Sequence, residues 1–565
     1  MRVIATAGHV DHGKSTLLRA LTGMEPDRWE EERRRGLTID LGFVWRGGLA
    51  FVDVPGHERF IGNMLAGVGP APAVLFVVAA DAGWSVQSGE HLAIINGLGI
   101  SRGVLAVTRA DLADPGPVLA DCRERLRGTS LAGVPALAVS AVTGDGLNEL
   151  RAALEGLPVP EQDPGAEVRL WIDRAFTVEG RGTVVTGTLG AGVIRVGDRL
   201  TLRGESVYVR GLHSLNQPCE EVAGLARVAV NLRGSSRPRR GDTLVTPDRW
   251  LAVSQADVRI YPAEKVPEQV IWHIGTAAGA ARVRPLGDDV ARVALGEALP
   301  LRIGDRALLR DPGSRRVWAV TVLDVRPPEL RRRGAARARA AELAEVDGTP
   351  DGAAELRRRG LARRDELAAM GAPVAAEPVI GEWVADPGHW ARLRARLVEI
   401  VTAHAANDPR DPGLPAETVR QALNLPDRAL VDALADGTPL GRSRGRLTAA
   451  APTLAPGIAR LHQDWADHPF AAPDSTRLAE LGLDIRALAA AEAAGRLTRL
   501  TPEVVLPPGA VDRALAVLAG LPQPFTAADA RKALATSRRV VIPLLEHLDG
   551  RGHTRRIDGS LREIV

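Results

Sequence analysis

The stretch from Gly8 to Ser15, in which four residues separate Gly8 from Gly13-Lys14-Ser15, restricts the fold of this chain more than any other feature. A β-branched run at residues 3–7 precedes it and a helical pattern at residues 16–21 follows it, which is the context of a phosphate-binding loop. Backbone amides of such a turn can surround a polyphosphate, and Lys14 can neutralise its β and γ oxygens. A tight strand-to-helix turn without function is the alternative. The loop residues expected to contact a nucleotide are Gly8, Asp11, His12, Gly13, Lys14, Ser15 and Thr16.

Asp53 follows the apolar run at residues 49–52 in the motif Asp-Val-Pro-Gly-His. It is therefore expected at the carboxyl end of a strand, where α/β sheets bind their ligands, and could hold Mg²⁺ through a water molecule. Gly56 leaves room for its amide to approach a γ-phosphate, and His57 is placed to orient the attacking water. An isolated histidine is usually structural, but this motif favours the catalytic interpretation.

Thr38 lies between these two motifs, after a charged run at residues 29–35 that is typical of a solvated helix face. Its hydroxyl could complete the Mg²⁺ shell only when the γ-phosphate is present, so the segment is predicted to be an order–disorder switch. The expected metal ligands are therefore Ser15, Thr38 and Asp53, and the expected catalytic residues are His57, Lys14 and Thr38.

Recognition of the base is expected from Thr108-Arg109-Ala-Asp111 and from Ser140-Ala141. The carboxylate of Asp111 can accept hydrogen bonds from guanine N1–H and the exocyclic amine, which adenine cannot supply. The usual motif is Asn-Lys-x-Asp, so Thr108 and Arg109 depart from it in the two positions that anchor the loop and stack on the base. The order of the motifs still predicts binding of GTP and GDP rather than ATP.

Local patterns along the 565 residues predict several domains, because a chain of this length is too long for one core. β-branched runs alternate with helical patterns up to a Pro-rich connector at residues 157–164, which is typical of an α/β fold with a mostly parallel sheet. From residue 168 to about 325, short strands separated by Gly-Asp turns predict two small β-barrels. The strands expected in the first part are residues 3–7, 49–54, 74–79, 104–107 and 136–139.

After residue 334 the composition becomes rich in Ala, Leu and Arg, and a unit of two helices and a Gly-containing strand pair recurs loosely. Copies are expected at residues 419–449, 478–506 and 528–565, with a less clear copy before Trp390. Repeats of roughly 55–70 residues resemble tandem winged-helix domains. The predicted fold class is therefore a P-loop α/β GTPase domain, two β-barrel domains and C-terminal tandem winged-helix domains.

Composition restricts the cellular setting. The two cysteines, Cys122 and Cys219, suggest a reducing cytosol, and we expect no signal peptide because no basic leader and long apolar stretch open the sequence. The longest apolar run, residues 71–80, is too short to cross a bilayer. The net charge of +3 permits nucleic-acid binding without requiring it. We expect a cytoplasmic monomer without membrane contact.

Three motifs together resemble translation factors of the elongation factor Tu family, and they are residues 8–14, 35–40 and 53–58. Further stretches look like the selenocysteine-specific branch of that family, SelB, and they are residues 38–43, 63–69, 172–178, 185–188, 212–217 and 544–556. The resemblance implies a GTPase domain at residues 1–164, a barrel with the aminoacyl pocket at 165–250 and a tRNA-binding barrel at 251–330. It also implies winged helices at residues 331–390, 391–452, 453–508 and 509–565, the last of which would bind an mRNA hairpin.

The aminoacyl pocket implied by the resemblance consists of Asp173, Arg174, His213 and Arg227. A selenol is anionic at neutral pH, whereas the seryl group of its precursor is neutral. Two guanidinium groups oriented by Asp173 could therefore separate the two ligands by about ten- to a hundredfold. A surface ion pair of little energetic weight is the alternative.

Basic residues also gather near the C-terminus, at the start of an expected helix and on the turn and strand that follow it. Such residues suit phosphate contacts and the reading of an unstacked base, while a solvated basic face is the alternative. The residues expected to bind RNA are Arg538, Arg539, Arg551, Arg555 and Arg556.

These expectations combine into a GTP-hydrolysing elongation factor that delivers selenocysteinyl-tRNA to the ribosome at recoded UGA codons, directed by an mRNA hairpin. Two alternatives stay open. A GTP-switched RNA-binding regulator would not need Arg174 and Arg227. A translation-factor-type GTPase outside selenocysteine decoding would not be expected to carry the helical C-terminal extension.

Overall fold

The structure of the chain is a computed structural model, and the residues that it describes are 1–26, 38–57, 60–159, 163–179, 182–234, 237–407, 413–443, 445–449, 455–493, 495–558 and 560–565. The charged run at residues 29–35, the motif residues Gly36, Leu37 and Glu58, and part of the Pro-rich connector lie outside these residues. The chain divides into two compact units, one of Met1–Arg358 with Ala362–Ala376 and one of Arg359–Leu361 with Glu377–Val565.

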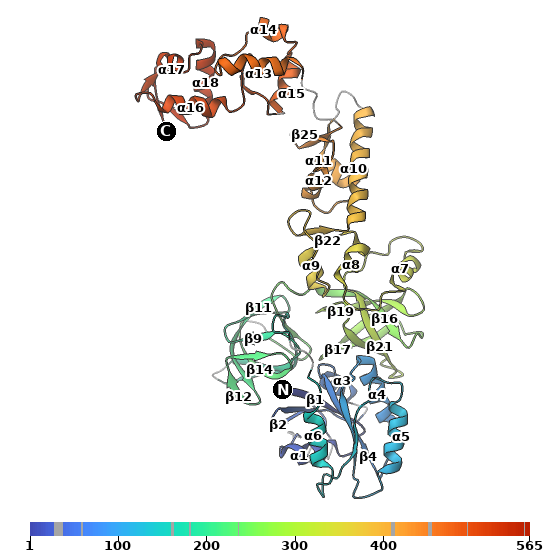
Figure 1. The fold of residues 1–565 in the computed structure, drawn as a ribbon. Helices are drawn as coiled ribbons and strands as arrows, with labels where there is room; N and C mark the ends of the chain where they lie inside the picture. The colour runs from blue at the N-terminus through green and yellow to red at the C-terminus, as the bar shows by residue number, and fades with distance from the viewer. Residues whose placement is uncertain are drawn as a thin grey trace. The chain divides into compact units, whose positions relative to one another are not determined.

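The N-terminal part of the first unit is an α/β domain built on a six-stranded sheet in the order β2-β3-β1-β4-β5-β6. Strand β2 runs antiparallel to β3, and the other neighbours are parallel. The strands are β1 (Arg2–Ala7), β2 (Gly42–Arg46), β3 (Leu49–Asp53), β4 (Ala73–Ala79), β5 (Gly103–Thr108) and β6 (Ala136–Ala138). The helices are α1 (Lys14–Thr22), α3 (Ile61–Val68), α4 (Val86–Leu98), α5 (Gly116–Leu126) and α6 (Leu147–Glu155), arranged around the sheet as in Figure 1.

The side chains of β1 alternate between the two faces of the sheet, and this alternation explains why helices cover both faces. Val3 and Ala5 belong to the core beneath α3, α4 and α5, whereas Ile4 belongs to the core beneath α1 and α6. Successive strand residues point to opposite faces, so a fully apolar strand requires cover on both sides. Strand β1 is therefore central, and the loop that follows it opens at the carboxyl edge of the sheet.

The five predicted strands are present, with small corrections at their ends. Val54 and Val139 lie just beyond β3 and β6, and helix α1 begins at Lys14 rather than at residue 16. Strand β2 was not predicted, because it is an edge strand whose short pattern contains Gly42 and Arg46 and lacks a long apolar run.

The next part of the first unit contains two β-barrels, as predicted. In the first, the sheet order is β10-β15-β7-β8-β14-β11-β12, and pairing of β10 with β11 closes the ring. The second is a closed barrel in the order β16-β19-β18-β17-β20-β21. The strands of the first barrel are β7 (Arg169–Val178), β8 (Gly182–Leu189), β10 (Arg199–Leu202), β11 (Glu205–Ser214), β12 (Gln217–Cys219), β14 (Ala226–Arg233) and β15 (Thr243–Val245). Two short strands beside it, β9 (Val193–Arg195) and β13 (Glu221–Ala223), form a separate two-stranded sheet. Those of the second are β16 (Ala252–Tyr261), β17 (Gln269–Ile274), β18 (Ala277–Pro285), β19 (Val290–Pro300), β20 (Arg306–Arg310) and β21 (Val317–Asp324).

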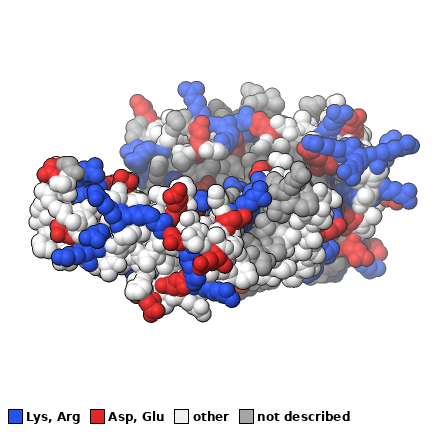
Figure 2. Space-filling view, turned by 90° about the horizontal axis from the view of Figure 1, so that it is seen from above, with Lys and Arg blue, Asp and Glu red and all other residues white. Residues whose placement is uncertain are grey.

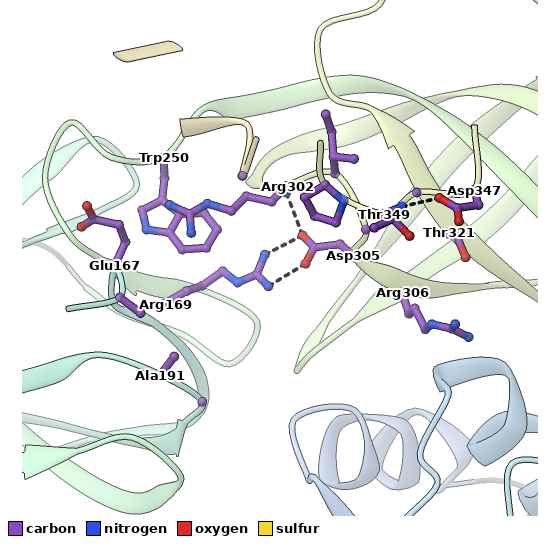
Figure 3. Close-up of a pocket in the computed structure, with 17 residues that line it drawn as sticks. Glu167, Arg169, Ala191, Trp250, Arg302, Asp305, Arg306, Thr321, Asp347 and Thr349 are labelled. Carbon is purple, nitrogen blue, oxygen red and sulfur yellow. Dashed lines mark hydrogen bonds and ion pairs between the residues drawn. The ribbon is translucent and has the colours of Figure 1, made fainter. Parts of the chain in front are cut away.

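A bidentate ion pair and an aromatic stack join the two barrels. The guanidinium of Arg169, on β7, contacts the carboxylate of Asp305 at 2.6 and 2.7 Å. The Cζ atoms of Arg302 and Arg169 lie 3.7 and 4.6 Å from the ring centroid of Trp250, which lies between β15 and β16. These residues line a cavity of about 620 Å³ whose walls come from both barrels and from residues 347–350, and Figure 3 shows the pair crossing it. A planar guanidinium group can form a bidentate ion pair and can also stack on an aromatic ring. The contacts at this junction therefore require a defined orientation of the side chains.

Four charged residues anchor the start of the helical region to the second barrel. Arg339 of α7 contacts Asp257 at 2.8 Å and Asp324 at 2.5 Å, and Arg292 of β19 contacts Asp257 at 2.7 Å. Both carboxylates are fully buried. Buried charges are tolerated only when paired, so α7 and this barrel depend on each other. The remaining elements of this region are α7 (Ala335–Leu343), α8 (Gly352–Arg359), β22 (Leu361–Arg363) and α9 (Arg364–Ala369).

The second unit contains three segments in which two successive helices are followed by a strand pair, and three apolar cores lie within these segments. The core of the third segment also contains Phe470, Val504 and Leu506 of the second. The segments fall where the three clearer repeats were predicted. The first has β24 (Gly413–Pro415), α11 (Ala416–Ala422), α12 (Ala429–Ala435), β25 (Gly441–Ser443) and β26 (Arg446–Thr448). The second has α13 (Gly457–Asp467), α14 (Ser475–Glu480), α15 (Ile485–Ala493), β27 (Thr498–Thr501) and β28 (Val504–Leu506). The third has α16 (Ala510–Ala519), β29 (Phe525–Thr526), α17 (Ala527–Ala533), α18 (Arg538–Gly550), β30 (Thr554–Arg556) and β31 (Leu561–Ile564).

The segments are preceded by β23 (Trp383–Ala385) and the long helix α10 (Pro387–Asn407). Within the described part of the chain, no helix has the length and apolar character needed to cross a membrane. The exact limits given above for the individual domains stay predictions.

Replacing Arg339 tests the anchoring of α7. Arg339→Ala would remove one of two guanidinium partners from each carboxylate, because Arg292 still contacts Asp257 and Arg358 still contacts Asp324 at 2.9 Å. We therefore expect a loss of about 1–3 kcal/mol in the free energy of unfolding. Arg337→Ala, which truncates an exposed arginine on the same helix, should change it by less than about 0.5 kcal/mol. Urea unfolding followed by circular dichroism measures both variants. Equal stability of the two would show that the buried ion pairs do not hold the helix.

Candidate functional site

The phosphate-binding loop wraps around the side chain of Lys14, the first residue of α1. Its Nζ donates to the carbonyl oxygens of Gly8 at 3.1 Å and His9 at 2.8 Å, and the side chain is almost fully buried. Gly8 adopts a φ of 128°, and an added Cβ would lie 2.1 Å from the carbonyl oxygen of Val77, so only glycine fits there. The ammonium group is thereby held within the loop at the N-terminus of a helix, which is where anions bind.

A histidine far away in the sequence supports this loop. The Nδ1 atom of His91, on α4, accepts a hydrogen bond from the backbone amide of Gly8 at 2.9 Å. Burial lowers the pKa of His91 to about 3, so the ring is neutral at physiological pH and can act as an acceptor. Sequence reasoning did not find His91, because no local motif marks a histidine on a helix face as the partner of a loop 83 residues earlier.

The three residues expected to bind Mg²⁺ lie together at the carboxyl end of β3. Ser15 Oγ donates to Asp53 Oδ2 at 2.7 Å and lies 3.1 Å from Thr38 Oγ1. Thr6, which the sequence did not indicate, donates to the other carboxylate oxygen of Asp53 at 2.7 Å. Two hydroxyls and a carboxylate are hard oxygen donors of the kind that Mg²⁺ prefers, so this set fits the ion.

Gly56 and His57 lie against the same loop. A Cβ on Gly56 would come within 2.4 Å of Lys14 Nζ and 2.5 Å of the backbone nitrogen of Val10. The backbone at Gly56 therefore approaches the phosphate loop more closely than a residue with a Cβ atom could. His57 follows directly, is half-buried and has its ring 6.1 Å from that of Phe60.

Thr108 and Arg109 anchor the phosphate loop although they depart from the usual base-recognition motif. The buried hydroxyl of Thr108 donates to the carbonyl oxygen of His12 at 2.7 Å. Arg109 donates to the carbonyl oxygen of Asp11 and to the carboxylate of Asp81, the latter at 2.9 Å. The two side chains therefore fix consecutive carbonyls of the loop, and Asp81 is a partner that sequence reasoning missed.

The two segments expected to recognise guanine lie side by side. The amide of Ala110 donates to the carbonyl oxygen of Val139 at 3.2 Å, which brings the loop of Asp111 next to Ser140 and Ala141. The hydroxyl of Ser140 accepts from the amide of Thr143 at 3.1 Å and so shapes its own loop. Asp111 is exposed at the edge of this arrangement, where its carboxylate is accessible to a ligand.

The structure corrects the arrangement expected for the candidate aminoacyl pocket on the first barrel. Asp173 is buried and accepts from Arg227 and, at 2.6 Å, from Thr186, but it does not bind Arg174. The register of β7 shifts between Ile172 and Arg174, so Asp173 lies at an irregularity of the strand. Asp173 therefore orients one arginine rather than both.

Arg174 turns instead toward the α/β domain, where it donates to the carbonyl oxygen of Leu41. Its Cζ and that of Arg227 lie 4.8 and 4.0 Å from the ring centroid of Phe43, on β2, so one aromatic ring lies under both guanidinium groups. His213 is exposed on β11 opposite Ala229, and within the described chain it forms no hydrogen bond with this group. Sequence reasoning gave no role to Phe43, because nothing local shows which strand of another domain a barrel arginine meets.

The five basic residues near the C-terminus are all exposed, but two of them have partners within the chain. Arg539 donates to the carbonyl oxygens of Ala472 at 2.9 Å and Pro473 at 2.7 Å in the preceding segment, and the RNA contact expected for it stays a prediction. Arg555 pairs with Glu563 on the neighbouring strand. Arg538, Arg551 and Arg556 are exposed. Basic and acidic side chains are interspersed on the face drawn in Figure 2.

Comparison with known protein families identifies one domain in the N-terminal part of the chain and one in the C-terminal part. Residues 1–158 match the model of the elongation factor Tu GTP binding domain, and residues 516–560 match that of the elongation factor SelB winged helix. Residues 1–158 therefore form a domain that binds GTP and GDP. The predicted fold class is confirmed.

Comparison with individual relatives extends this result. The selenocysteine-specific elongation factor of Escherichia coli is 40% identical over 347 residues, which are 59% of this chain and 56% of that protein. The match thus spans little more than half the length of this relative. Elongation factor Tu 2 of Streptomyces avermitilis is 32% identical over 375 residues, 57% of this chain and 96% of that protein. The predicted resemblance is confirmed.

The whole chain also resembles a solved structure. The crystal structure of a bacterial selenocysteine-specific elongation factor, EF-Sec, aligns with 100% of both chains at a TM-score of 0.75 and 23% identity. At this identity the similarity shows a shared fold.

Thr108→Val should weaken nucleotide binding. Valine has nearly the shape of threonine but cannot donate to the carbonyl oxygen of His12, which would stay buried without its partner. We expect affinity for GDP to fall about five- to thirtyfold, since an unsatisfied buried acceptor costs about 1–2 kcal/mol. Titration with a fluorescent GDP analogue measures this. Thr177→Val, at an exposed position of β7 in the first barrel, is the matched control, and equal affinities in both variants would contradict a role for Thr108 in anchoring the loop.

Proposed function

Because this chain belongs to the elongation factor Tu family of translational GTPases, we propose that its GTP form delivers selenocysteinyl-tRNA to the ribosome at recoded UGA codons in the cytosol. An mRNA hairpin bound by the C-terminal winged helices would direct it there. Similarity to selenocysteine-specific elongation factors and to the SelB winged helix supports this choice. The observation that carries it is the pair of guanidinium groups on the first barrel, both packed on Phe43.

Hydrolysis of GTP in this proposal is attack of water on the γ-phosphate. Lys14 stabilises charge on the β and γ oxygens from within the phosphate loop, and His57 orients the attacking water. Gly56 brings its backbone to the γ-phosphate because no side chain intervenes. Electrostatic stabilisation and positioning supply most of the catalysis in such reactions, so the ribosome acts by fixing His57 in its productive position.

Ser15, Thr38 and Asp53 would hold a magnesium ion in this site, with Asp53 acting through water. Bound there, Mg²⁺ neutralises charge that develops on the β and γ oxygens. The hydrogen bonds among the three side chains leave their oxygens close together, and Thr6 keeps the carboxylate of Asp53 in its orientation.

Selection of the aminoacyl group rests on charge. The selenolate of selenocysteine can accept charge-assisted hydrogen bonds from Arg174 and Arg227, whereas a neutral seryl hydroxyl gains less. The difference of roughly 1.5–3 kcal/mol corresponds to about ten- to a hundredfold in affinity. The side chains of Arg227 and Asp173 are only 13% and 2% exposed, so solvent screens this site weakly. His213, exposed on the neighbouring strand, would contact the edge of the aminoacyl group.

The C-terminal segment supplies the RNA contacts. Arg538 at the start of α18, Arg551 at its end and Arg556 on β30 are exposed and can reach phosphates and an unstacked base. Arg555 forms an ion pair with Glu563, so it would contribute less to RNA binding than the other arginines.

Arg227→Lys tests the aminoacyl pocket. Lysine keeps the charge beside Asp173 but lacks the bidentate fork, so discrimination between selenocysteinyl-tRNA and seryl-tRNA on the same tRNA body should fall about tenfold. Arg233→Lys, exposed on the same strand, should leave it unchanged. Binding of both aminoacyl-tRNAs is measured with a non-hydrolysable GTP analogue. Equal affinity of the unmodified protein for the two ligands would sink the proposed function.

Replacing Arg551 and Arg556 together with alanine tests RNA binding. We expect affinity for the hairpin downstream of an in-frame UGA in the source genome to fall at least about tenfold, and the slope of log K against log salt to shrink by about one for each lost phosphate contact. Arg513→Ala, on the exposed face of α16, is the control. An unchanged salt slope in the double variant would place the hairpin elsewhere.

A further inference from the structure

Thr6 is the one polar residue in the apolar run at residues 3–7, which forms most of β1. Its side chain is fully buried, as is that of Asp53 beside it. A buried hydroxyl is unfavourable unless it has hydrogen-bond partners, and an apolar strand supplies none from its own side chains. The partners of Thr6 therefore indicate its role.

The hydroxyl of Thr6 has two partners, and both lie where β3 ends. Thr6 Oγ1 donates to Asp53 Oδ1 at 2.7 Å and accepts from the backbone amide of Val54 at 3.0 Å. The last paired residues of β1 and β3 are Ala5 and Val52, so the ladder between these strands stops just before this point. Beyond the ladder, one hydroxyl thus connects both the side chain of Asp53 and the backbone that follows it to β1.

The backbone fixed in this way leads directly to the part of the chain that faces the phosphate loop. The side chain of Val54 is buried in the core beneath α3, α4 and α5, so this residue is held by both its amide and its side chain. Only Pro55, whose ring restricts its φ, separates Val54 from Gly56. Gly56 lies against Lys14 of the phosphate loop, and His57 follows it. A displacement of Val54 would therefore be passed on to Gly56 and His57.

We propose that Thr6 is a positioning residue for magnesium binding and for GTP hydrolysis. Its hydroxyl sets the direction of the Asp53 carboxylate, which would hold Mg²⁺ through water, and fixes the start of the segment that carries Gly56 and His57. Ser15 donates to the other oxygen of Asp53 at 2.7 Å, so without Thr6 the carboxylate could turn about its Cβ–Cγ bond. This inference rests on the roles proposed for Asp53 and His57, and it does not depend on which aminoacyl-tRNA the protein carries.

Thr6→Val tests the magnesium part of this role, because valine has nearly the shape of threonine but can neither donate to Asp53 nor accept from Val54. The quantity to measure is the factor by which Mg²⁺ strengthens binding of GDP, from titrations of the full chain in Mg²⁺ and in EDTA. We expect this factor to fall about tenfold or more, since a lost hydrogen bond to a charged group lowers affinity by about ten- to a hundredfold. Affinity in EDTA should stay near that of the unmodified protein, because Asp53 then has no metal to hold.

Ribosome-stimulated hydrolysis at saturating GTP and Mg²⁺ is the second readout. In Thr6→Val the rate constant should fall at least about tenfold, because Gly56 and His57 lose a fixed starting point and small displacements of positioned groups are costly in rate. Thr6→Ser keeps the hydroxyl and should restore most of both quantities. Thr6→Ala, which removes the hydroxyl without adding a methyl group beside the carboxylate, should change both quantities in the same direction as Thr6→Val.

Thr22→Val is the matched control. Thr22 is also buried in this domain, but its hydroxyl donates to the carbonyl oxygen of Leu18 in its own helix at 2.7 Å. Thr22→Val should therefore keep the Mg²⁺ factor and the rate constant of the unmodified protein. In an Asp53→Asn background, Thr6→Val should change the Mg²⁺ factor by less than about twofold, because two residues that act through one group are not additive.

The inference is overturned if Thr6→Val and Thr6→Ala keep both the Mg²⁺ factor and the rate constant. It is also overturned if they weaken GDP binding equally in Mg²⁺ and in EDTA, which would indicate general damage to the domain. Circular dichroism shows whether each variant is folded. None of these measurements uses aminoacyl-tRNA, so a protein that binds selenocysteinyl-tRNA and seryl-tRNA equally would end the proposed delivery function and leave this test unchanged.

Discussion

The carboxylate of Asp53 is fully buried, and the nucleotide site is organised around its need for hydrogen-bond partners. A charge in this position is tolerated only if donors surround it, and Thr6 and Ser15 supply them from β1 and α1. Those contacts fix the end of β3 against the phosphate loop, and Ser15 in turn lies beside Thr38. The phosphate loop, the end of β3 and Thr38 are therefore placed by one buried carboxylate.

Arginine geometry explains much of what lies beyond this site. Arg169 binds Asp305 with two parallel hydrogen bonds between the barrels, Arg339 bridges two buried carboxylates, and Arg227 forks onto Asp173. A guanidinium can form such planar pairs and stack on an aromatic ring at the same time, which lysine cannot. The domains of the first unit are thus connected by charged groups whose direction is fixed.

Several parts of the site followed from local sequence. Asp53, Ser15 and Thr38 were expected to lie together, and they do, because a strand end and a loop-to-helix turn have predictable directions. The sequence showed that Thr108 and Arg109 depart from the usual Asn-Lys-x-Asp motif, but it did not show what these two residues do. In the structure, both residues hold carbonyls of the phosphate loop, a task that depends on distances between segments about a hundred residues apart. His91 and Phe43 carried no local signal at all.

The sequence by itself determined the α/β domain, the two barrels, the repeated helical units and the position of the phosphate-binding loop, because periodicity and short motifs act over a few residues. Tertiary structure alone decided which side chains from different domains meet. It paired the carboxylate of Asp173 with Arg227 rather than with Arg174, and it placed Phe43 beneath both arginines. It also brought Arg539 against the carbonyl oxygens of Ala472 and Pro473 in the preceding segment. These contacts depend on strand register and domain packing, which no short stretch of sequence encodes.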